Sequence, residues 1–219
     1  MTAGSGIFHA EMPKPTIKKE DGKEIQDPEN RGLQLWINLP SRLKMTTPMY
    51  RNLREKYVPR ATLDNGIEIR LIAGEMKNIP GVGSLSGPVT NASVQAQDVT
   101  YIELIMPPNS TFSFNVKEGY TALVYVIEGE IFAPKGETEV LIKEKNTGLF
   151  DRNGQNVTFK TTDKNARVIF LTGRPIEELI AWYGPIVMNT EEELVQAFQE
   201  LREGKFIKHK ATEVDDITS

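Results

Sequence analysis

The chain has 219 residues, of which 39% are hydrophobic and 26% are charged, and this is the composition of a folded globular protein with one large or two modest domains rather than a disordered chain. It contains no cysteine, which excludes disulfides, thiolate catalysis and cysteine-based zinc or iron–sulfur sites. The formal net charge is −4 and the charges are scattered without a basic stripe, so we do not expect direct binding to nucleic acid.

The N-terminal residues carry no secretory signal. Met1–Gly6 has neither the basic region nor the apolar region that such a signal needs. The longest apolar runs, such as Thr121–Ile127, are too short to cross a bilayer. We therefore expect a cytoplasmic protein, or a nuclear one in a eukaryote, with no membrane partner.

One of the two histidines stands close to this end. His9 precedes Glu11 by two residues, and on a strand this spacing places both side chains on one face, where imidazole and carboxylate can converge. A His-x-Glu pair alone favours a structural histidine over a metal ligand. The second histidine, His209, lies between two lysines near a polar tail, so we expect it to be a solvated surface residue.

The segment Pro13–Arg31 is charged and poor in apolar residues, which predicts an exposed connection. From Ile67 onward the pattern is that of short strands separated by turn residues. Alternating apolar and polar residues predict half-buried strands at Ile67–Leu71 and Phe112–Val116. Denser apolar runs predict strands buried on both faces at Val99–Met106 and Ala122–Ile127.

Three further short strands are predicted at Val140–Ile142, Val157–Phe159 and Val168–Leu171. Many short strands at this spacing indicate an antiparallel sandwich or barrel. The glycine-rich run Gly81–Gly87 lacks the lysine of a phosphate-binding loop, so we interpret it as a surface loop. Trp36 and Trp182 are interpreted as packing residues, in the core or between domains.

Helices are predicted only late in the chain. Pro175 can begin a helix whose apolar residues continue to Tyr183, before Gly184-Pro185 ends it. Thr190 and Glu193 have the spacing of a capping box and predict a second helix that Gly204 closes. We expect its apolar stripe to dock within the chain, and the tail after Lys208 to be frayed.

Two blocks of sequence carry a resemblance to a known family. Gly4–Pro13 followed by Gly32–Pro40 resembles the signature of the pirin family. The resemblance continues to about Phe206 through three further segments, Leu71–Glu75, Val126–Glu130 and Gly173–Pro185.

The resemblance implies a mainly β protein built of double-stranded β-helix (cupin, or jelly-roll) barrels. It implies an incomplete first barrel, a complete second barrel and short C-terminal helices. The expected division is a first-barrel remnant with linker at 1–60, the second barrel at 61–173, and C-terminal helices with the tail at 174–219.

In pirins, by this resemblance, three histidines and one glutamate hold an iron in the first barrel. His9 and Glu11 match the last histidine and the glutamate, but the preceding His-x-His pair is absent, since only eight residues precede His9. A non-haem iron site needs at least two histidines and a carboxylate. The pair is therefore half a set in one chain, and iron is expected to bind weakly or not at all unless two such pairs meet in a dimer.

The resemblance leaves three functions open. The first is a pirin-type, iron-associated regulatory or binding protein with an incomplete metal site and a regulatory protein as its partner. The second is a quercetin 2,3-dioxygenase-type oxidoreductase acting on a flavonol-like small molecule. The third is a metal-free, degenerate pirin without activity, and no catalytic residue is assigned in any of them.

Overall fold

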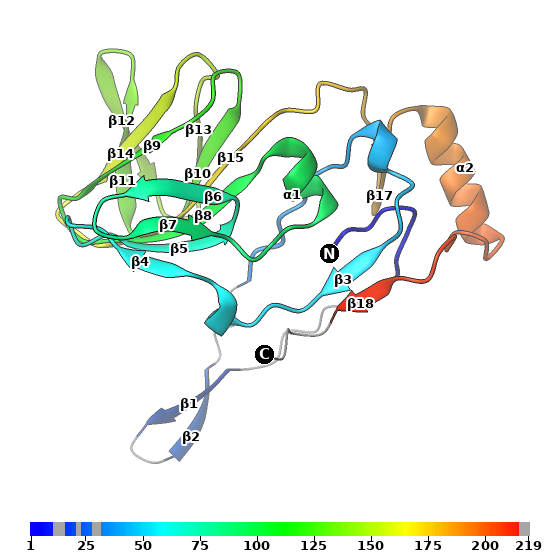
Figure 1. Cartoon of the computed structure of the whole chain (residues 1–219), viewed down its shortest axis with the longest axis horizontal. Coiled ribbons are helices and arrows are strands. Elements are labelled where there is room, and N and C mark those ends of the chain that lie inside the picture. Colours follow the sequence, from blue (N-terminus) through cyan, green and yellow to red (C-terminus); the bar gives the residue numbers. More distant parts are fainter. Residues whose placement is uncertain (11–15, 21–22, 28–31, 215–219) are drawn as a thin grey trace.

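A computed structural model describes residues 1–10, 16–20, 23–27 and 32–214 of the chain. Two sheets face each other at one end of the molecule, and the N-terminal residues, a small hairpin and the longer helix lie at the other end (Figure 1). The described chain is mainly β, and its paired sheets confirm the predicted jelly-roll fold.

The larger sheet has six antiparallel strands in the order β13-β10-β15-β8-β5-β4. Their bounds are β4 Arg60–Thr62, β5 Glu68–Ala73, β8 Thr100–Met106, β10 Thr121–Glu128, β13 Thr147–Leu149 and β15 Ala166–Gly173. The facing sheet has the order β12-β11-β14-β9. Its strands are β9 Thr111–Asn115, β11 Glu130–Lys135, β12 Thr138–Lys143 and β14 Asn156–Thr161. Every strand that the alternating patterns predicted is present.

The core lies between these sheets and is rich in aromatic rings. The Phe112 ring packs at 5.5 Å from Phe159 and at 6.1 Å from Phe170, measured between ring centroids. Apolar burial of this kind is the main stabilising contribution to a β sandwich. The prediction that Ala122–Ile127 is buried on both faces is wrong, because burial alternates along β10 and only every second side chain faces the core.

The outer face of the larger sheet carries a buried carboxylate. Glu103 on β8 is 8% exposed and pairs with Arg70, at 3.4 Å, and with Arg167. On the facing sheet, Glu139 and Lys160 form an ion pair of 2.8 Å whose side chains are about half exposed. The Glu103 carboxylate is shielded from solvent and the Glu139 carboxylate is not, so we expect the Glu103 ion pairs to contribute more to stability.

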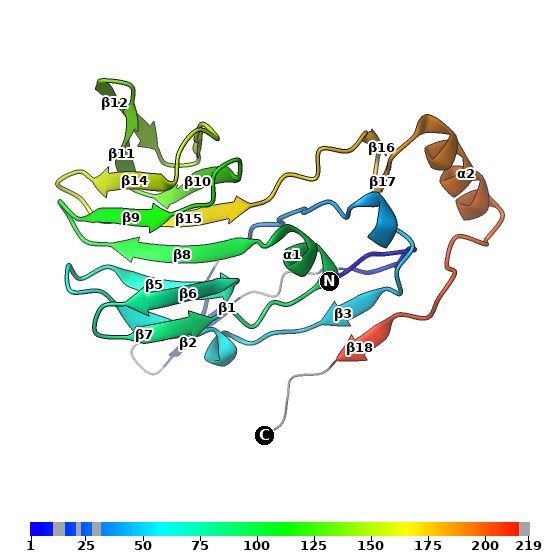
Figure 2. The ribbon, with the colours of Figure 1, turned by 45° about the horizontal axis from the view of Figure 1, so that its top comes forward.

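Several smaller elements surround the barrel (Figure 2). Those near it are β6 Glu75–Ile79, β7 Gly83–Ser86, α1 Ala92–Gln97 and the short 3-10 helix Glu55–Tyr57. Those farther along are β1 Thr16–Glu20, β2 Lys23–Asp27, the 3-10 helix Ser41–Leu43, β3 Met49–Arg51, β16 Ala181–Tyr183, β17 Ile186–Met188, α2 Glu191–Arg202 and β18 Thr212–Val214. The run Gly81–Gly87 contributes to the β6–β7 hairpin, whose strands pair from Glu75 with Ser86 to Ile79 with Gly83.

Helix α2 confirms the capping-box prediction. The Thr190 hydroxyl accepts a hydrogen bond from the Glu193 amide at 3.2 Å, and the Glu193 carboxylate accepts one from the Thr190 amide at 3.1 Å. Gly204, with φ +70°, follows the helix end. The buried face of α2 packs on the β16–β17 hairpin, so its stripe docks within the chain as expected.

The helix predicted from Pro175 to Tyr183 is wrong. Ala181–Tyr183 is strand β16, which pairs with β17 across a two-residue loop of Gly184, with φ +55°, and Pro185. The aromatic and β-branched residues around this loop favour paired strands, and a glycine of positive φ suits the first loop position. The same Gly-Pro that was interpreted as a helix stop is therefore a hairpin turn.

Strand pairing occurs in two segments that we expected to lack regular structure. Within Pro13–Arg31, β1 and β2 form an antiparallel hairpin, which the prediction of an exposed connection did not anticipate. After Lys208, β18 pairs in parallel with β3, while residues 215–219 lie outside the described part. No helix in the described part of the chain is long and apolar enough to cross a membrane. The division at residues 60 and 173 stays a prediction.

Candidate functional site

The predicted metal pair is not assembled by the described residues. His9 is exposed on a stretch without regular secondary structure, so the strand geometry on which the His-x-Glu argument depended does not hold at His9. Glu11 lies outside the described residues. Across the described ranges, no group of three or more His, Cys, Asp or Glu side chains is placed to hold a metal ion. The metal site at His9 and Glu11 stays a prediction, and His209 is exposed as expected.

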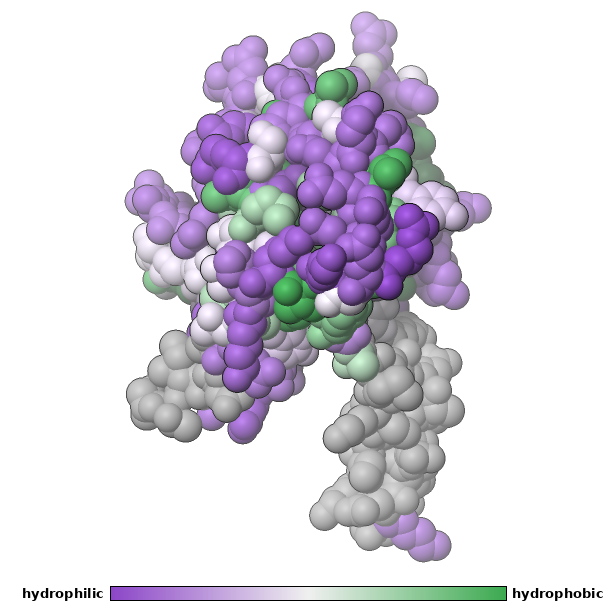
Figure 3. Space-filling model, turned by 90° about the vertical axis from the view of Figure 1, so that its right-hand side faces the viewer, coloured by the Kyte–Doolittle hydropathy of each residue, from purple (hydrophilic) through white to green (hydrophobic). Residues whose placement is uncertain are grey.

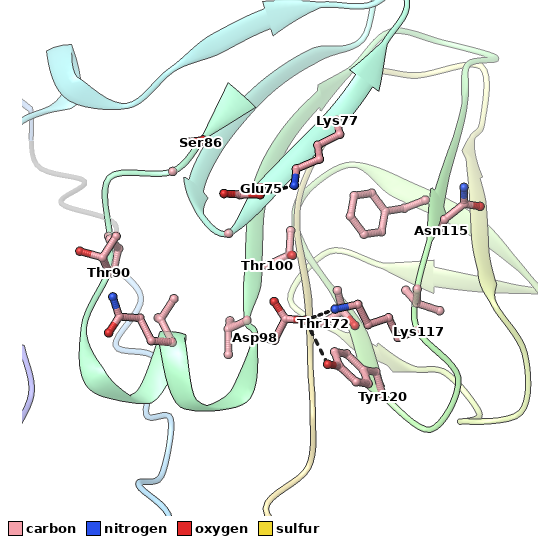
Figure 4. A pocket seen from close by; sticks show the side chains of 18 residues that line it. Glu75, Lys77, Ser86, Thr90, Asp98, Thr100, Asn115, Lys117, Tyr120 and Thr172 are labelled. Atoms are coloured by element: carbon pink, nitrogen blue, oxygen red, sulfur yellow. Dashed lines mark hydrogen bonds and ion pairs between the residues drawn. The ribbon is translucent and has the colours of Figure 1, made fainter. Parts of the chain in front are cut away.

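A cavity of about 490 Å³ lies at the mouth of the barrel instead. Its lining comes from the start of β8, the ends of β9 and β15, the β6–β7 hairpin and α1 (Figure 4). Side chains from both facing sheets therefore converge on it, together with two elements that form its rim.

Two glycines allow the rim hairpin to fold over the mouth. Gly74 has φ +86°, and a Cβ atom there would lie 2.8 Å from the Val99 carbonyl oxygen. A Cβ atom on Gly87 would lie 2.6 Å from the Ala73 backbone. The Gly87 amide donates to the Gly74 carbonyl at 2.8 Å, which ties the two ends of the hairpin together. Larger residues at either position would push the hairpin away from the barrel.

Asp98 is the most connected polar group of the cavity. It ends α1 in the left-handed conformation, with φ 51°, which Asp adopts more readily than most residues. Its carboxylate accepts hydrogen bonds from Lys117 Nζ at 2.5 Å and Tyr120 Oη at 3.0 Å (Figure 4). The hydrogen bond from Lys117 lowers the pKa of Asp98, with help from Tyr120 and from the charges of Lys117 and Arg174.

The pKa values of Lys117 and Tyr120 shift in the direction opposite to that of Asp98. The bond to Asp98 raises the pKa of the Lys117 ammonium. Partial burial raises the pKa of the Tyr120 phenol, and its hydrogen bond to Asp98 adds to this. Asp98 is thus held ionised, Lys117 charged and Tyr120 neutral at physiological pH, so Asp98 is a poor proton acceptor.

The charges in the cavity lining balance. Lys77 Nζ lies 2.9 Å from a Glu75 carboxylate oxygen, which makes a second ion pair on the hairpin side (Figure 4). With Asp98 and Lys117, these are the four charged residues of the lining, two of each sign. Arg174 acts on Asp98 from outside the lining and donates to the Ala96 carbonyl.

Thr172 belongs to the cavity lining, and its hydroxyl oxygen is buried with almost no accessible surface. It continues the inward row of β15 after Val168 and Phe170, and it is 6% exposed. Its Oγ1 has no hydrogen-bond partner among the described residues. Beside it, Phe114 packs at 5.2 Å from the Phe170 ring and forms an apolar wall. Native proteins rarely leave a buried hydroxyl unpaired without a reason.

Sequence reasoning missed this cavity. Asp98 stands in a different segment from Lys117 and Tyr120, and no motif spacing connects it to them. The one available signal was Thr172, a polar residue that ends an otherwise apolar inward row. Trp36 and Trp182, interpreted as packing residues, are 56% and 66% exposed and contact each other edge to face at 6.1 Å. The core placement of these residues is therefore wrong.

The face of the molecule on the α2 side is mostly hydrophilic in the view of Figure 3, although Leu179, Ile180 and Trp182 in the neighbouring segment are exposed. Figure 3 shows hydrophilic side chains over most of this face, with apolar side chains in small separate patches. Large continuous apolar patches are the usual mark of a protein interface. The barrel mouth is therefore the better candidate for a functional site.

Comparison with known proteins places the chain among pirins and their structural relatives. A family model, the pirin C-terminal cupin domain, matches residues 101–207. A Thermoplasma acidophilum protein with the provisional name quercetin 2,3-dioxygenase is 42% identical over 96% of this chain and 78% of its own length. The "Pirin-like protein" of Caulobacter vibrioides is 33% identical over 94% of this chain and 66% of its own length.

Human "Pirin" is 30% identical over 94% of this chain, which spans 63% of its length. A crystal structure of quercetin 2,3-dioxygenase from Acinetobacter baumannii is 29% identical, with a TM-score of 0.67, over 78% of this chain and 55% of that chain. The chain thus spans less than two thirds of several of the proteins that it matches.

Proposed function

The chain belongs to the pirin family, and from this membership and the cavity we propose that it is a pirin-type binding protein that holds a small organic molecule at the mouth of its barrel. The observation that carries the proposal is the convergence on one cavity of the polar groups of Asp98, Lys117 and Tyr120 with the apolar ring of Phe114. Binding is non-covalent, because the lining offers no activated nucleophile: the hydrogen bond to Asp98 raises the pKa of Lys117, so its amine stays protonated.

The dimensions and chemistry of the cavity support binding. Its volume of about 490 Å³ falls within the range of ordinary small-molecule sites. Phe114 supplies an apolar wall, and the paired charges supply fixed donors and acceptors. Such a mixture orients a ligand and gives specificity.

The donor set does not fit a complete iron site. His9 and Glu11 offer one imidazole and one carboxylate, whereas a non-haem iron site uses at least two imidazoles and one carboxylate. Between Met12 and Lys208 the sequence has no histidine to complete the set from the barrel. We therefore derive the binding function from the barrel mouth alone.

Backbone NMR tests the proposal directly. Titration with small organic fragments of neutral, anionic, cationic and aromatic types should shift amide signals of residues 98–100, 115–117 and 172–173 for at least one type. The variant Gln95→Trp fills part of the cavity from an exposed helical position and should weaken that binding. The matched control is Gln196→Trp, on the exposed face of α2, which should not. Shifts confined to other regions for every fragment type would contradict the proposal.

A second candidate is quercetin 2,3-dioxygenase-type chemistry, favoured by the names of the Thermoplasma and Acinetobacter proteins. It is tested by loading the chain with ferrous iron without oxygen, measuring the metal content, and then following oxygen uptake with quercetin. Our account predicts iron no higher than in a His9→Ala control and no uptake. Stoichiometric iron that His9→Ala removes, together with quercetin-dependent uptake, would establish the dioxygenase instead.

The third reading, a degenerate pirin without activity, corresponds to failure of both experiments. The expectation of a regulatory protein partner stays a prediction. The exposed Trp36–Trp182 contact is the feature of the described chain that a protein partner would most readily use, because aromatic side chains are enriched at such interfaces.

A further inference from the structure

We propose that the free edge of strand β12, Thr138–Lys143, is an interface at which two copies of this chain pair strand to strand. The inference goes beyond the proposed binding function and does not depend on it. Three features of the edge lead to it. The edge is open, it exposes apolar side chains, and its sequence of charges is complementary to itself in one antiparallel register.

Strand β12 is the outermost strand of the facing sheet. It pairs with β11 on one side, from Glu130 with Lys143 to Lys135 with Thr138, and no described strand pairs with its other side. A cavity of about 610 Å³ separates it from the segment 146–151, which contains β13. Both ribbon views place β12 at the outer end of the barrel (Figure 1, Figure 2). Such an edge presents N–H and C=O groups with which another strand can pair.

The strand exposes apolar side chains on both of its faces. Ile142 faces the core and is 8% exposed, so Val140 shares the inner face and Leu141 lies on the outer face. Val140 is nevertheless 40% exposed beside the cavity, and Leu141 is 36% exposed next to its cross-strand neighbour Phe132. A second strand added to this edge would cover part of both side chains.

The outer row of β12 selects one register. It contains Glu139, Leu141 and Lys143, and a two-fold axis at Leu141 sets Glu139 of each copy opposite Lys143 of the other. The two Leu141 side chains then face each other, and Val140 lies opposite Ile142 on the inner face. Moving the axis to the next residue in either direction sets a charged side chain opposite Leu141. A parallel, in-register pairing would set like charges side by side.

Both charges are available to a second copy. Lys143 forms no ion pair with a described residue, and its cross-strand neighbour Glu130 contacts Lys164 at 3.9 Å. Glu139 contacts Lys160 through Oε1 at 2.8 Å, in a pair that is about half exposed. Its second carboxylate oxygen can therefore accept from the second copy's Lys143.

The interface is expected to be weak. Pairing of one short strand buries less surface than a standard protein interface, so we expect a dissociation constant of about 10–100 μM. Backbone hydrogen bonds and the apolar contacts supply the affinity, and the two symmetry-related Glu139–Lys143 contacts supply the register. The dimer should consequently form and dissociate with protein concentration.

The test is sedimentation equilibrium at protein concentrations from about 5 μM to about 1 mM, where the mass should rise from that of a monomer towards that of a dimer. Lys143→Glu and Glu139→Lys should each weaken dimerisation about tenfold or more, because each sets like charges opposite each other at two symmetry-related contacts. An equimolar mixture of the two variants should form a heterodimer about as tightly as the unsubstituted chain pairs with itself, since opposite charges then meet at all these contacts. Restored pairing in the mixture would also show that both variants are folded.

The matched control is Arg202→Glu, which makes the same change of charge as Lys143→Glu at the end of α2, far from β12 (Figure 1). It should leave dimerisation unchanged. A chain that stays monomeric up to about 1 mM would overturn the inference, as would a dimer that neither β12 variant weakens. Two weakened variants that do not pair with each other would also contradict it, because the charges would then not meet across the interface.

Discussion

The same substitution at two buried threonines of the barrel should have opposite effects on stability. Thr161 on β14 is 3% exposed, and its hydroxyl accepts from the Ser110 amide at 2.9 Å and donates to the Pro107 carbonyl at 2.7 Å. Thr172 on β15 is 6% exposed, and its hydroxyl has no partner among the described residues. Valine matches the shape of threonine without the hydroxyl, so the same substitution isolates the hydroxyl at both positions.

The magnitudes follow from what each change leaves behind. Thr161→Val leaves the buried Ser110 amide without its side-chain acceptor, and an orphaned buried donor costs about 1–3 kcal/mol. We expect Thr161→Val to lower the free energy of unfolding by about 2 kcal/mol. Thr172→Val removes a hydroxyl that is desolvated without compensation, so we expect the stability to stay the same or rise by up to about 1 kcal/mol.

Chemical denaturation of both variants measures the difference in the free energy of unfolding. The slope of this free energy against denaturant concentration should stay unchanged. Thermal unfolding should agree, with Thr161→Val melting about 4–8 °C below the unsubstituted chain, since about 2–4 °C corresponds to 1 kcal/mol in a chain of this size. The reasoning is refuted if Thr172→Val is as destabilising as Thr161→Val. The Thr172 hydroxyl would then have a hydrogen-bond partner in the folded protein.

Three further predictions concern charge and capping. Asp98→Asn should be less stable than the unsubstituted chain at pH 6, and melting temperatures should converge as the pH falls below 3.8, because a lowered pKa stabilises only while the carboxylate is ionised. Glu103→Gln should cost about 2 kcal/mol in urea unfolding, whereas Glu139→Gln, at an exposed pair, should cost less than about 0.5 kcal/mol. Thr190→Ala should cost about 1 kcal/mol and raise amide exchange in the first turn of α2.

The strands of the barrel were predictable because burial on one face imposes a period of two on the sequence. Ile67–Leu71 shows this pattern, and its three apolar residues Ile67, Ile69 and Leu71 are buried. Helix α2 was predictable because its capping box is local, so Thr190 and Glu193 carry the signal without help from distant residues. The family resemblance extended these local signals to the whole jelly roll.

The failures arose where tertiary pairing overrode local preference. Pro175–Tyr183 has helical spacing, but Ala181–Tyr183 finds a strand partner in Ile186–Met188. Helix α1 was not predicted, because its six residues are too few to show a period. Its start depends on Asn91, whose side chain accepts from the Val94 amide at 3.0 Å.

The cavity could not be predicted because its members meet only in three dimensions. Asp98 and Lys117 are joined by the fold, and nothing in either segment indicates the other. An unpaired hydroxyl is likewise a property of the surroundings, since the sequence does not tell that Thr161 finds hydrogen-bond partners and Thr172 finds none. The predicted metal pair failed for the opposite reason: the sequence offered a spacing, but the structure does not provide the geometry. The spacing of His9 and Glu11 suggested a shared strand, and the structure forms no strand at His9.

The most direct test of the binding site is a crystal structure of the chain soaked with the tightest-binding fragment from the NMR titration. We predict a fragment seated against Phe114 at the barrel mouth, with the Asp98–Lys117 pair intact. A fragment bound elsewhere on the molecule, with the barrel mouth occupied only by solvent, would contradict the account.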